Sequence, residues 1–385
     1  MSLGAMQDWS MRISHVIDHA AREAPDREIV TRGADGSETR TDWAGIRRDA
    51  KKMSQALQAL GLGKGDKVAS LAMNHARHLV SWFGVAGMGG VLHTCNPRLF
   101  EDQLEYIVNH AEDKVMIYDA AFQPIVDKMR DKWPTVEHYI CFDSGEHTTS
   151  FEDWIGAQDG DFEWVDGDER DPCMICYTSG TTGNPKGVML SHRNILSNCE
   201  GAVNALMDLG LGNEVFLSFL PLSHSYEHMA GQFFPMTIGA EIYYAEGADT
   251  LAANLVEARP TIMTAVPRLY ETFHHRITLG VKKAGGLNQL QNSGRIEPFL
   301  QNIYDVIVFR VDGMALFVDD GYADHGAVFV FQQQFQQGDI CGTGFARKIP
   351  LKDCFAPLPN SNTAISFALN EAAIQTTEAD RVDTL

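Results

Sequence analysis

The sequence predicts an α/β protein whose sheets are mostly parallel and carry helices on both faces. The alternation of two kinds of segment leads to this prediction. From residue 67 to residue 277, short apolar runs alternate with longer segments whose apolar residues repeat at helical spacing. Such alternation is typical of βαβ units, which build parallel sheets covered by helices. Ligands of these sheets bind at the carboxyl ends of the strands, so the residues that follow each strand deserve the closest inspection.

Two amphipathic helices are expected before the alternation begins. Residues 12–24 carry their apolar side chains on one face. Asp42–Leu60 does the same over a longer span, and Gly61 stands where a C-terminal glycine ends a helix.

The expected strands are short and largely apolar. They are Lys67–Met73, Val91–Thr94, Val115–Asp119, His138–Phe142, Met174–Tyr177, Val215–Leu220, Glu241–Tyr244 and Thr261–Thr264. The helices expected between and after them are His75–Gly89, Leu99–Asn109, Ala120–Lys132, His192–Met207, residues 225–237, Leu251–Ala258 and Pro267–Ile277. The polar, acidic residues 144–170 are expected to form a surface connection.

The character of the sequence changes after the first domain, residues 10–280. Residues 281–298 are polar and glycine-containing, and indicate a linker. Residues 299–356 are expected to be a small β-rich segment of unclear type, because Asp-Gly turns typical of hairpins separate its strand-like runs. These runs are Ile303–Val311, Met314–Val318 and Ala327–Phe331. The tail, residues 357–385, is polar, a composition typical of disordered chain ends.

Charge and composition exclude several functional classes. The 51 acidic residues against 31 Lys and Arg give a formal net charge of -20, which disfavours any nucleic-acid partner. No run of 18 apolar residues occurs, so no membrane span is expected. Residues 1–9 lack the pattern of a secretory signal. Seven scattered cysteines, an odd number, are typical of reduced thiols and favour a cytoplasmic protein.

Cys173 and Cys176 form a C-x-x-C motif that has two interpretations. One is a redox or metal-binding pair. The other is two small apolar residues within a buried strand. No second Cys or His pair lies nearby at the spacing of a metal site, so the structural interpretation is preferred.

The sequence Y-T-S-G-T-T-G-N-P-K-G, from Tyr177 to Gly187, is the motif that carries chemistry. It directly follows an expected strand. Its three glycines allow a tight turn and close approach of a ligand to the backbone, and its hydroxyls and free N–H groups can donate to phosphate oxygens. Lys186 adds a mobile positive charge. The loop therefore predicts a polyphosphate site, although the spacing is not that of a Walker loop. The candidate phosphate-binding residues are Thr178, Ser179, Gly180, Thr181, Thr182, Gly183 and Lys186.

This loop resembles the Ser/Thr/Gly-rich loop of the adenylate-forming superfamily, which includes acyl-CoA synthetases, luciferases and the adenylation domains of peptide synthetases. Three further segments are similar to fatty-acyl-CoA synthetases and occur in the family's order. Residues 96–113 resemble medium-chain enzymes, residues 220–224 the acyl-pocket motif, and residues 265–270 long-chain enzymes. The resemblance covers roughly residues 10–280, which are identified as an AMP-binding or adenylation domain.

The resemblance implies an AMP-forming fatty acid–CoA ligase. A carboxylate would attack the α-phosphate of ATP to give an acyl-adenylate, and the thiol of coenzyme A would then displace AMP. The loop would hold the β- and γ-phosphates, and Lys186 and His224 would be the catalytic residues. Mg²⁺ is the implied cofactor, with its protein ligands unknown. The implied partners are a fatty acid, ATP and coenzyme A.

The surroundings of His224 leave alternatives open. A lone histidine after a strand is often structural, but strand ends are where ligands bind, so His224 is interpreted as a site residue. Glu227 and His228 either complete a polar cluster or lie on the outer face of the next helix. The apolar segment Met229–Ile238 either walls an acyl tunnel or, the simpler interpretation, belongs to the core.

The sequence departs from the family pattern after residue 295. The Tyr-Gly-x-Thr-Glu segment and the Gly-Arg-x-x-Asp hinge of the family are not found. An alternative is therefore a truncated or divergent relative that binds ATP or an acyl ligand without turnover. A third hypothesis makes the C-terminal hairpins an interaction module. The length of the acyl chain and the oligomeric state stay open.

Overall fold

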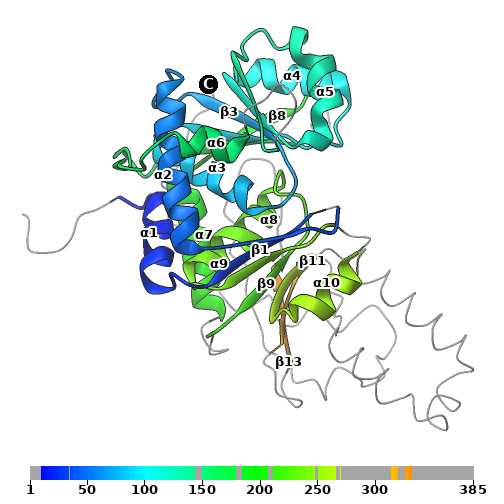
Figure 1. Cartoon of the computed structure of the whole chain (residues 1–385). Helices are drawn as coiled ribbons and strands as arrows, with labels where there is room; N and C mark the ends of the chain where they lie inside the picture. The colour runs from blue at the N-terminus through cyan, green and yellow to red at the C-terminus, as the bar shows by residue number, and fades with distance from the viewer. Residues whose placement is uncertain are drawn as a thin grey trace, which may run out of the picture.

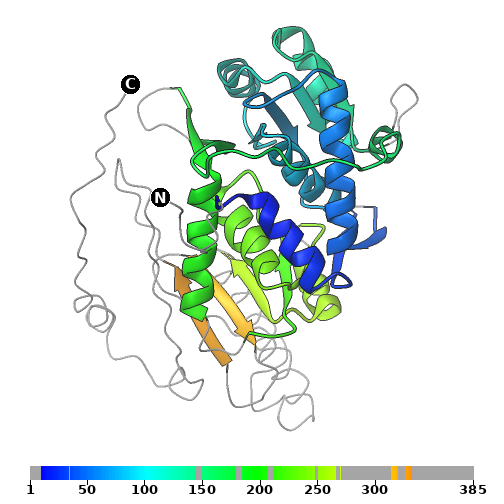
Figure 2. The same cartoon turned by 90° about the vertical axis from the view of Figure 1, so that its left-hand side faces the viewer.

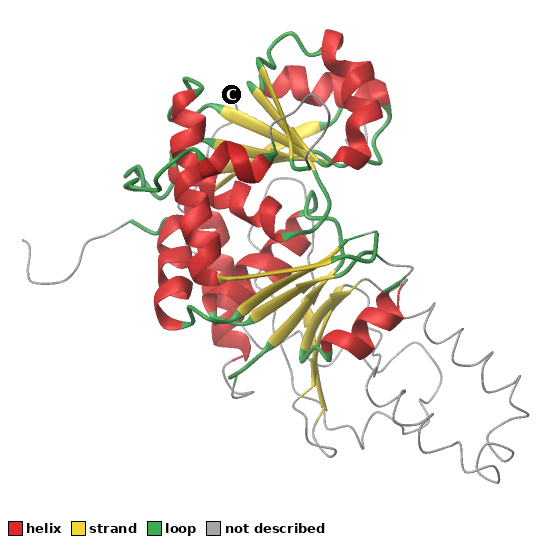
Figure 3. Cartoon of the chain, in the orientation of Figure 1, coloured by secondary structure: helices red, strands yellow, loops and turns green. Residues whose placement is uncertain are grey.

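The fold is built from two sheets, which Figure 1 and Figure 3 show one above the other with helices around and between them. The computed structural model describes residues 10–33, 35–143, 150–178, 184–206, 211–247, 250–265 and 269, together with 314–319 and 326–331. One sheet has six strands and the other has seven. The predicted α/β class is confirmed.

The six-stranded sheet has the order β6-β5-β3-β4-β7-β8. All of its neighbouring strands are parallel except β7 and β8, which form an antiparallel pair. Its strands are β3 (Lys67–Leu71), β4 (Val91–Thr94), β5 (Val115–Tyr118), β6 (His138–Cys141), β7 (Pro172–Thr178) and β8 (Lys186–Ser191).

The seven-stranded sheet has the order β13-β12-β11-β9-β10-β1-β2. Its four middle strands are parallel, whereas β2 at one edge and β12 and β13 at the other are antiparallel. Its strands are β1 (Glu28–Arg32), β2 (Glu38–Asp42), β9 (Val215–Ser218), β10 (Glu241–Tyr244), β11 (Ile262–Ala265), β12 (Met314–Asp319) and β13 (Gly326–Phe331).

Helices cover both faces of each sheet, and three hydrophobic clusters hold the layers together. The outer helices are α4 (Glu101–Ala111) and α5 (Gln123–Met129) on the six-stranded sheet, and α10 (Leu251–Ala258) on the seven-stranded sheet. The helices of the shared inner layer are α1 (Ile13–Glu23), α2 (Trp43–Ala59), α3 (Ala76–Gly87), α7 (His192–Leu206), α8 (Ser225–His228), the π-helix η4 (Met229–Phe233) and α9 (Phe234–Thr237). Figure 2 shows α1 between α2 and α7, which it contacts.

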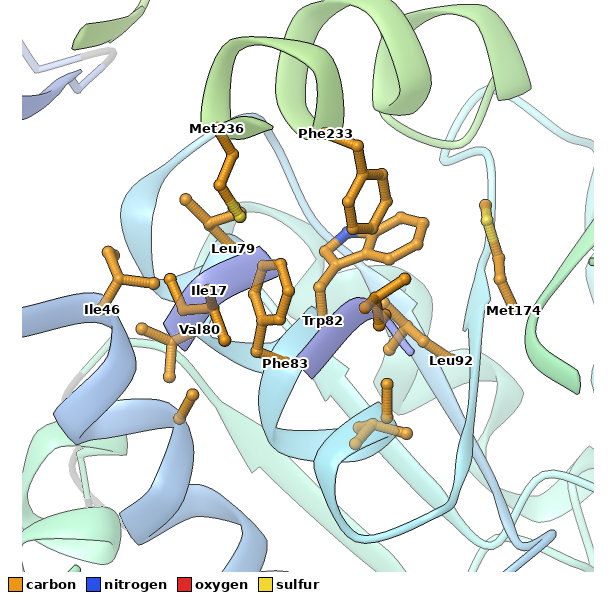
Figure 4. Close-up of a cluster of buried hydrophobic side chains, with 14 of the residues drawn as sticks. Ile17, Ile46, Leu79, Val80, Trp82, Phe83, Leu92, Met174, Phe233 and Met236 are labelled. Carbon is orange, nitrogen blue, oxygen red and sulfur yellow. The ribbon is translucent and has the colours of Figure 1, made fainter. Parts of the chain in front are cut away.

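Helix α3 lies at the centre of the inner layer and contacts strands of both sheets. Residues 78–87 of this helix are all buried, as expected for a helix that is apolar on every side. Figure 4 shows Trp82 and Phe83 of α3 pointing towards Phe233 and Met236, with Met174 of β7 nearby. The Trp82 and Phe233 rings pack edge to face with centroids 5.3 Å apart. Both sheets therefore share one hydrophobic core.

Two glycines let α2 and α3 approach each other closely. The Ser54 hydroxyl of α2 donates to the Gly84 carbonyl at 2.7 Å. A Cβ atom on Gly84 would lie 2.8 Å from side-chain atoms of Met53, which is closer than packed carbon atoms come. At Gly87, one turn further along α3, a Cβ atom would overlap the Trp164 ring. Gly84 therefore sets the separation of α2 and α3, and Gly87 leaves room for the Trp164 ring.

Most of the predicted elements are confirmed, with three kinds of correction. Strands β1, β2 and β8 were not predicted, because each carries polar or charged residues and lies at or near a sheet edge. The connection over residues 144–170 is not wholly on the surface, since it contains a short helix, α6 (Phe151–Gly156), with Phe151 and Ile155 buried. The single helix predicted over residues 225–237 is instead interrupted by the π-helix.

The C-terminal part is described only in two strands. Runs 314–318 and 327–331 were predicted as strands, and they form β12 and β13. Strand β12 pairs with β11, and β13 pairs with β12 as the edge strand of the seven-stranded sheet. The expected helix Pro267–Ile277 (apart from residue 269), the linker 281–298, the run Ile303–Val311 and the tail 357–385 lie outside the described residues. Among the residues that the structure describes, no helix is long and apolar enough to cross a membrane.

The C-x-x-C motif is structural, as predicted. Cys173 and Cys176 are both free thiols buried in β7. Side chains three residues apart in a strand point to opposite faces of the sheet, so the two thiols cannot hold one metal ion together. Burial raises the pKa of both thiols, that of Cys176 to about 12, which keeps them protonated.

Substitution of Gly84 by alanine is expected to lower the free energy of unfolding by about 1–2 kcal/mol, because the added methyl group must displace Met53. Urea unfolding measures the change. The matched control is Gly201→Ala in α7, where a Cβ atom meets nothing within 4 Å. This control is expected to be neutral or to stabilise by up to about 1 kcal/mol through helix propensity. Equal effects of the two substitutions would contradict the packing argument.

Candidate functional site

The predicted phosphate loop is the connection of an antiparallel hairpin. Thr178 ends β7, Lys186 begins β8, and the two residues are partners in the register of the hairpin. Both side chains are exposed. The connection leaves from the carboxyl end of β7, where ligands of α/β sheets bind. The predicted phosphate-binding residues Ser179, Gly180, Thr181, Thr182 and Gly183 lie outside the described residues.

Tyr177 forms the base of this hairpin. Its hydroxyl lies 2.7 Å from Nδ1 of His110, and its ring packs against His93 with centroids 4.9 Å apart. Across the hairpin, a Cβ atom on Gly187 would lie 3.0 Å from Tyr177 Cζ and 2.9 Å from Ile175 Cδ1. Glycine at position 187 therefore leaves room for the tyrosine ring, which fixes the start of the loop relative to the sheet.

A buried ion pair lies beneath Tyr177. Nδ1 of His93 and Oδ2 of Asp113 are 2.6 Å apart, and both side chains are fully buried. Burial alone lowers the pKa of an imidazole, but the Asp113 carboxylate outweighs it and raises the pKa of His93 to about 10. Burial also raises the pKa of Asp113, so the pair retains a proton at neutral pH. Cys95 lies 3.6 Å from Nε2 of His93 with its own pKa raised by burial. Sequence reasoning missed this pair, because nothing in the spacing joins β4 to the residue that precedes β5.

His224 lies at the carboxyl end of the other sheet. It follows β9 by six residues and forms the N-cap of α8, where its Nδ1 accepts a hydrogen bond from the Tyr226 amide at 3.5 Å. The residue is exposed, yet partial desolvation of the ring lowers its pKa. The ring is therefore neutral at physiological pH and able both to donate and to accept a hydrogen bond.

Glu227 and His228 do not lie on an outer face, and that alternative is wrong. Glu227 has no exposed surface and His228 is 1% exposed. The Glu227 carboxyl group accepts hydrogen bonds from the hydroxyls of Ser218 on β9 and Thr264 on β11, each at 2.6 Å. Burial raises its pKa to about 7, and these hydrogen bonds oppose the shift. Glu227 thus belongs to a polar cluster, but its partners there are Ser218 and Thr264 and differ from the histidines that the prediction named.

His228 is part of the packing instead of the site surface. Its ring contacts Trp82 with centroids 5.1 Å apart, and burial lowers its pKa to about 3. In the following segment, Met229–Ile238, residues 230–236 are buried. This agrees with the simpler interpretation that the segment belongs to the core.

Asn74 joins the carboxyl ends of the two sheets. It follows β3 of the six-stranded sheet, and its Nδ2 donates to Oγ of Ser218 at 3.1 Å and to the Leu220 carbonyl at 2.7 Å. Ser218 and Leu220 belong to the end of β9 and the turn that leads to His224. The carboxyl ends of the two sheets thus meet here, and candidate site residues follow strands of both sheets. Sequence reasoning missed Asn74, Ser218 and Thr264, because their partners are distant in the chain.

Comparison with known proteins decides the family. A model of the family described as AMP-binding enzyme matches residues 17–301. This chain belongs to the AMP-binding enzyme family. The resemblance to adenylate-forming enzymes that the Tyr177–Gly187 loop predicts is therefore confirmed.

Curated relatives of this AMP-binding enzyme are acyl-CoA ligases by name. It is 36% identical over 282 residues to 3-methylmercaptopropionyl-CoA ligase of Ruegeria pomeroyi, covering 70% of this chain and 52% of the relative. It is 38% identical over 365 residues to a long-chain-fatty-acid–CoA ligase of Thermus thermophilus, covering 90% of this chain and 63% of the relative. A medium-chain-fatty-acid–CoA ligase of Ectopseudomonas oleovorans is 37% identical, covering 58% and 42%. The chain spans about half the length of the curated relatives it matches.

Solved structures share the fold of this AMP-binding enzyme. The N-terminal domain of FACL13 from Mycobacterium tuberculosis superposes with a TM-score of 0.60 at 26% identity, covering 68% of this chain and 64% of that domain. The anthranilate CoA ligase AuaEII, in complex with anthranoyl-AMP, gives a TM-score of 0.63 at 24% identity, covering 70% and 52%. The latter likeness supports the fold alone.

Substitution Asp113→Asn is expected to lower the free energy of unfolding by about 3 kcal/mol, because it leaves the buried His93 without its counter-charge. Thermal and urea unfolding measure the loss. The control is Glu101→Gln, which breaks the exposed ion pair with Lys128 and is expected to cost less than about 1 kcal/mol. A loss at Asp113 as small as that of the control would contradict the importance of the buried pair.

Substitution Glu227→Gln is expected to change how stability depends on pH. The pKa of Glu227 is raised by burial from 4.5 to about 7, so the folded state binds a proton that the unfolded state releases between these values. Wild-type stability should therefore fall relative to the glutamine variant as pH rises from about 4.5 to 7, by about 3 kcal/mol in total. Urea unfolding of both proteins from pH 4.5 to 8 measures the difference. A constant difference across this range would contradict the raised pKa.

Proposed function

We propose that this chain is an AMP-forming acyl-CoA ligase. It would use ATP to activate a fatty acid and then join the acyl group to coenzyme A. The β7–β8 hairpin supports this proposal most directly, because the family's loop sequence lies between the exposed Thr178 and Lys186, at the carboxyl end of β7. The names of the curated relatives supply the reaction class. The acid carboxylate would displace pyrophosphate from ATP, and the thiol of coenzyme A would then displace AMP.

The reaction has an electrostatic obstacle that the proposed residues address. A carboxylate and a triphosphate repel each other, so their approach requires cations and oriented donors that are already in place. Lys186, exposed at the start of β8, is proposed to neutralise phosphate charge. The proposed phosphate donors are Thr178, Ser179, Gly180, Thr181, Thr182 and Gly183.

His224 is proposed to orient the carboxylate that is activated. The lowered pKa of His224 keeps its ring neutral at physiological pH. A neutral imidazole can hydrogen-bond to the attacking carboxylate without forming a salt bridge that would stabilise the ground state. Lys186 and His224 are thus the two proposed catalytic residues, one from each sheet.

Mg²⁺ is the proposed cofactor, and coenzyme A is the proposed second substrate. Enzymes that use nucleotides hold Mg²⁺ largely through phosphate oxygens and water, and the ion lowers the charge of the triphosphate. The exposed Thr178 hydroxyl at the hairpin is the kind of oxygen ligand that suits it. The described residues contain no group of three or more His, Cys, Asp or Glu side chains that could hold a metal ion, so no protein ligand set is assigned.

A cytoplasmic location is proposed from the cysteines. The five cysteines in the described part of the chain are buried free thiols, as is usual for proteins of reducing compartments.

ATP–pyrophosphate exchange on the full chain tests the proposal. Exchange is expected to rise with one or more of a panel of medium- and long-chain fatty acids. Lys186→Ala and His224→Ala are each expected to lower it roughly 100-fold, as the loss of a group that stabilises developing charge does. The control is Lys128→Ala, which removes an exposed lysine of α5 that pairs with Glu101 and should leave exchange unchanged.

The alternative of a non-catalytic relative predicts a different pattern. ATP would still bind in a manner that depends on Lys186, but no fatty acid would stimulate exchange. That result would overturn the proposed ligase activity and direct attention to binding.

A further inference from the structure

The Glu227 carboxyl group is buried inside the protein and is held there by hydrogen bonds. It has no exposed surface, yet both oxygens accept hydrogen bonds, Oε1 from Ser218 and Oε2 from Thr264. The backbone N–H groups of Phe219 and Leu220 also face the carboxyl group and favour its ionised form, because they lower its pKa. Two hydroxyl donors from two strands and two N–H groups of one turn therefore surround one side chain of α8.

A glycine of the π-helix, Gly231, leaves the space that this carboxyl group occupies. A Cβ atom on Gly231 would lie 2.5 Å from Oε1 of Glu227. Any larger residue at position 231 would displace the carboxylate from its donors. An apolar side chain could fill the position of Glu227 without the cost of burying a charge. That cost is on the order of several kcal/mol per ion, even after the surroundings relax. A buried acid that costs stability beside a binding site is a common sign of function.

The turn from Phe219 to His224 is held from two sides. From α8, the Glu227 carboxyl group faces the backbone amides of Phe219 and Leu220. From the other sheet, Asn74 donates to the Leu220 carbonyl and the Ser218 hydroxyl. Ser218 connects the two, because it accepts from Asn74 and donates to Glu227. The network Asn74–Ser218–Glu227–Thr264 thus crosses from β3 through β9 to β11.

We propose that Glu227 is a positioning residue whose carboxylate holds the Phe219–His224 turn in place, so that His224 meets the acid substrate in a fixed geometry. This inference rests on the proposed function, since it assigns His224 to the acid. The ionised group presents only acceptor oxygens to the two hydroxyls and the two backbone N–H groups. The protonated group carries a hydrogen on one oxygen, so it accepts hydrogen bonds less well and holds the turn less firmly.

The ionisation of Glu227 therefore regulates the site. The pKa of Glu227, raised by burial to about 7, places this change near neutral pH. The titratable groups that face it are few. His224 and His228 on α8 have lowered pKa values and stay neutral above pH 7, and the pKa of Tyr244 on β10 is raised by burial and by Glu227. Above about pH 7, Glu227 is thus the group of this set that carries charge.

A nuclear magnetic resonance titration tests the hold without requiring activity. In ¹⁵N-labelled full-length protein, the amide resonances of Phe219 and Leu220 are expected to shift together with a midpoint near pH 7. Glu227→Gln should abolish this titration. Thr264→Val removes one donor to the carboxylate and should raise the midpoint, whereas Thr264→Ser keeps the hydroxyl and should restore it. Amides that do not titrate in the wild type, or that still titrate in Glu227→Gln, would overturn the proposal.

Exchange kinetics test the positioning role. At pH 8, Glu227→Gln is expected to raise the KM for the acid about tenfold while the KM for ATP changes less than twofold. At pH 6, the two proteins should converge, because wild-type Glu227 is then protonated. A purely structural role would lower kcat and raise both KM values at every pH, and that outcome would overturn the positioning role. If the wild type shows no exchange with any acid, the ligase function fails, and the amide titration alone decides whether Glu227 holds the turn.

Discussion

Burial of helix α3 between the two sheets is the constraint on which the rest of the structure depends. The helix is apolar on every side, so it is stable only where both sheets cover it. Asn74 immediately precedes this helix and follows β3, and its amide reaches the end of β9. Packing of α3 therefore brings the carboxyl ends of the two sheets together. A phosphate hairpin on one sheet and a histidine on the other can then belong to one site.

The polar groups at these ends are stabilised at different costs. The His93–Asp113 pair satisfies its own charge and supports Tyr177 at the base of the hairpin. Glu227 has neutral donors but no cation among the groups that shift its pKa, so burial raises it. The first arrangement favours a rigid base, whereas the second would make the turn proposed to bind the acid sensitive to pH at the expense of stability. The rigid His93–Asp113 pair thus belongs to the six-stranded sheet, and the pH-sensitive Glu227 lies at the seven-stranded sheet.

The sequence predicted the repeating part of the fold and the local motifs, because both depend on neighbouring residues. Buried strands such as Val115–Tyr118 and the loop after Tyr177 are recognisable from runs of a few residues. Edge strands such as Glu38–Asp42 were missed, because their side chains are exposed and their stability comes from a neighbouring strand. The partners of Glu227 were missed for the same reason, since Thr264 lies 37 residues away. Contacts of this kind follow from sheet order, which local patterns do not encode.

The proposed function requires that the carboxyl ends of both sheets form a single site for nucleotide and acid. Hydrogen exchange of the full chain with ATP, Mg²⁺ and a fatty acid tests this claim most directly. Peptides of the β7–β8 hairpin and of residues 216–228 are both expected to gain protection, and Lys186→Ala is expected to abolish both gains. Protection of neither segment, or protection of the hairpin with no change around His224 for any acid, would contradict a shared site.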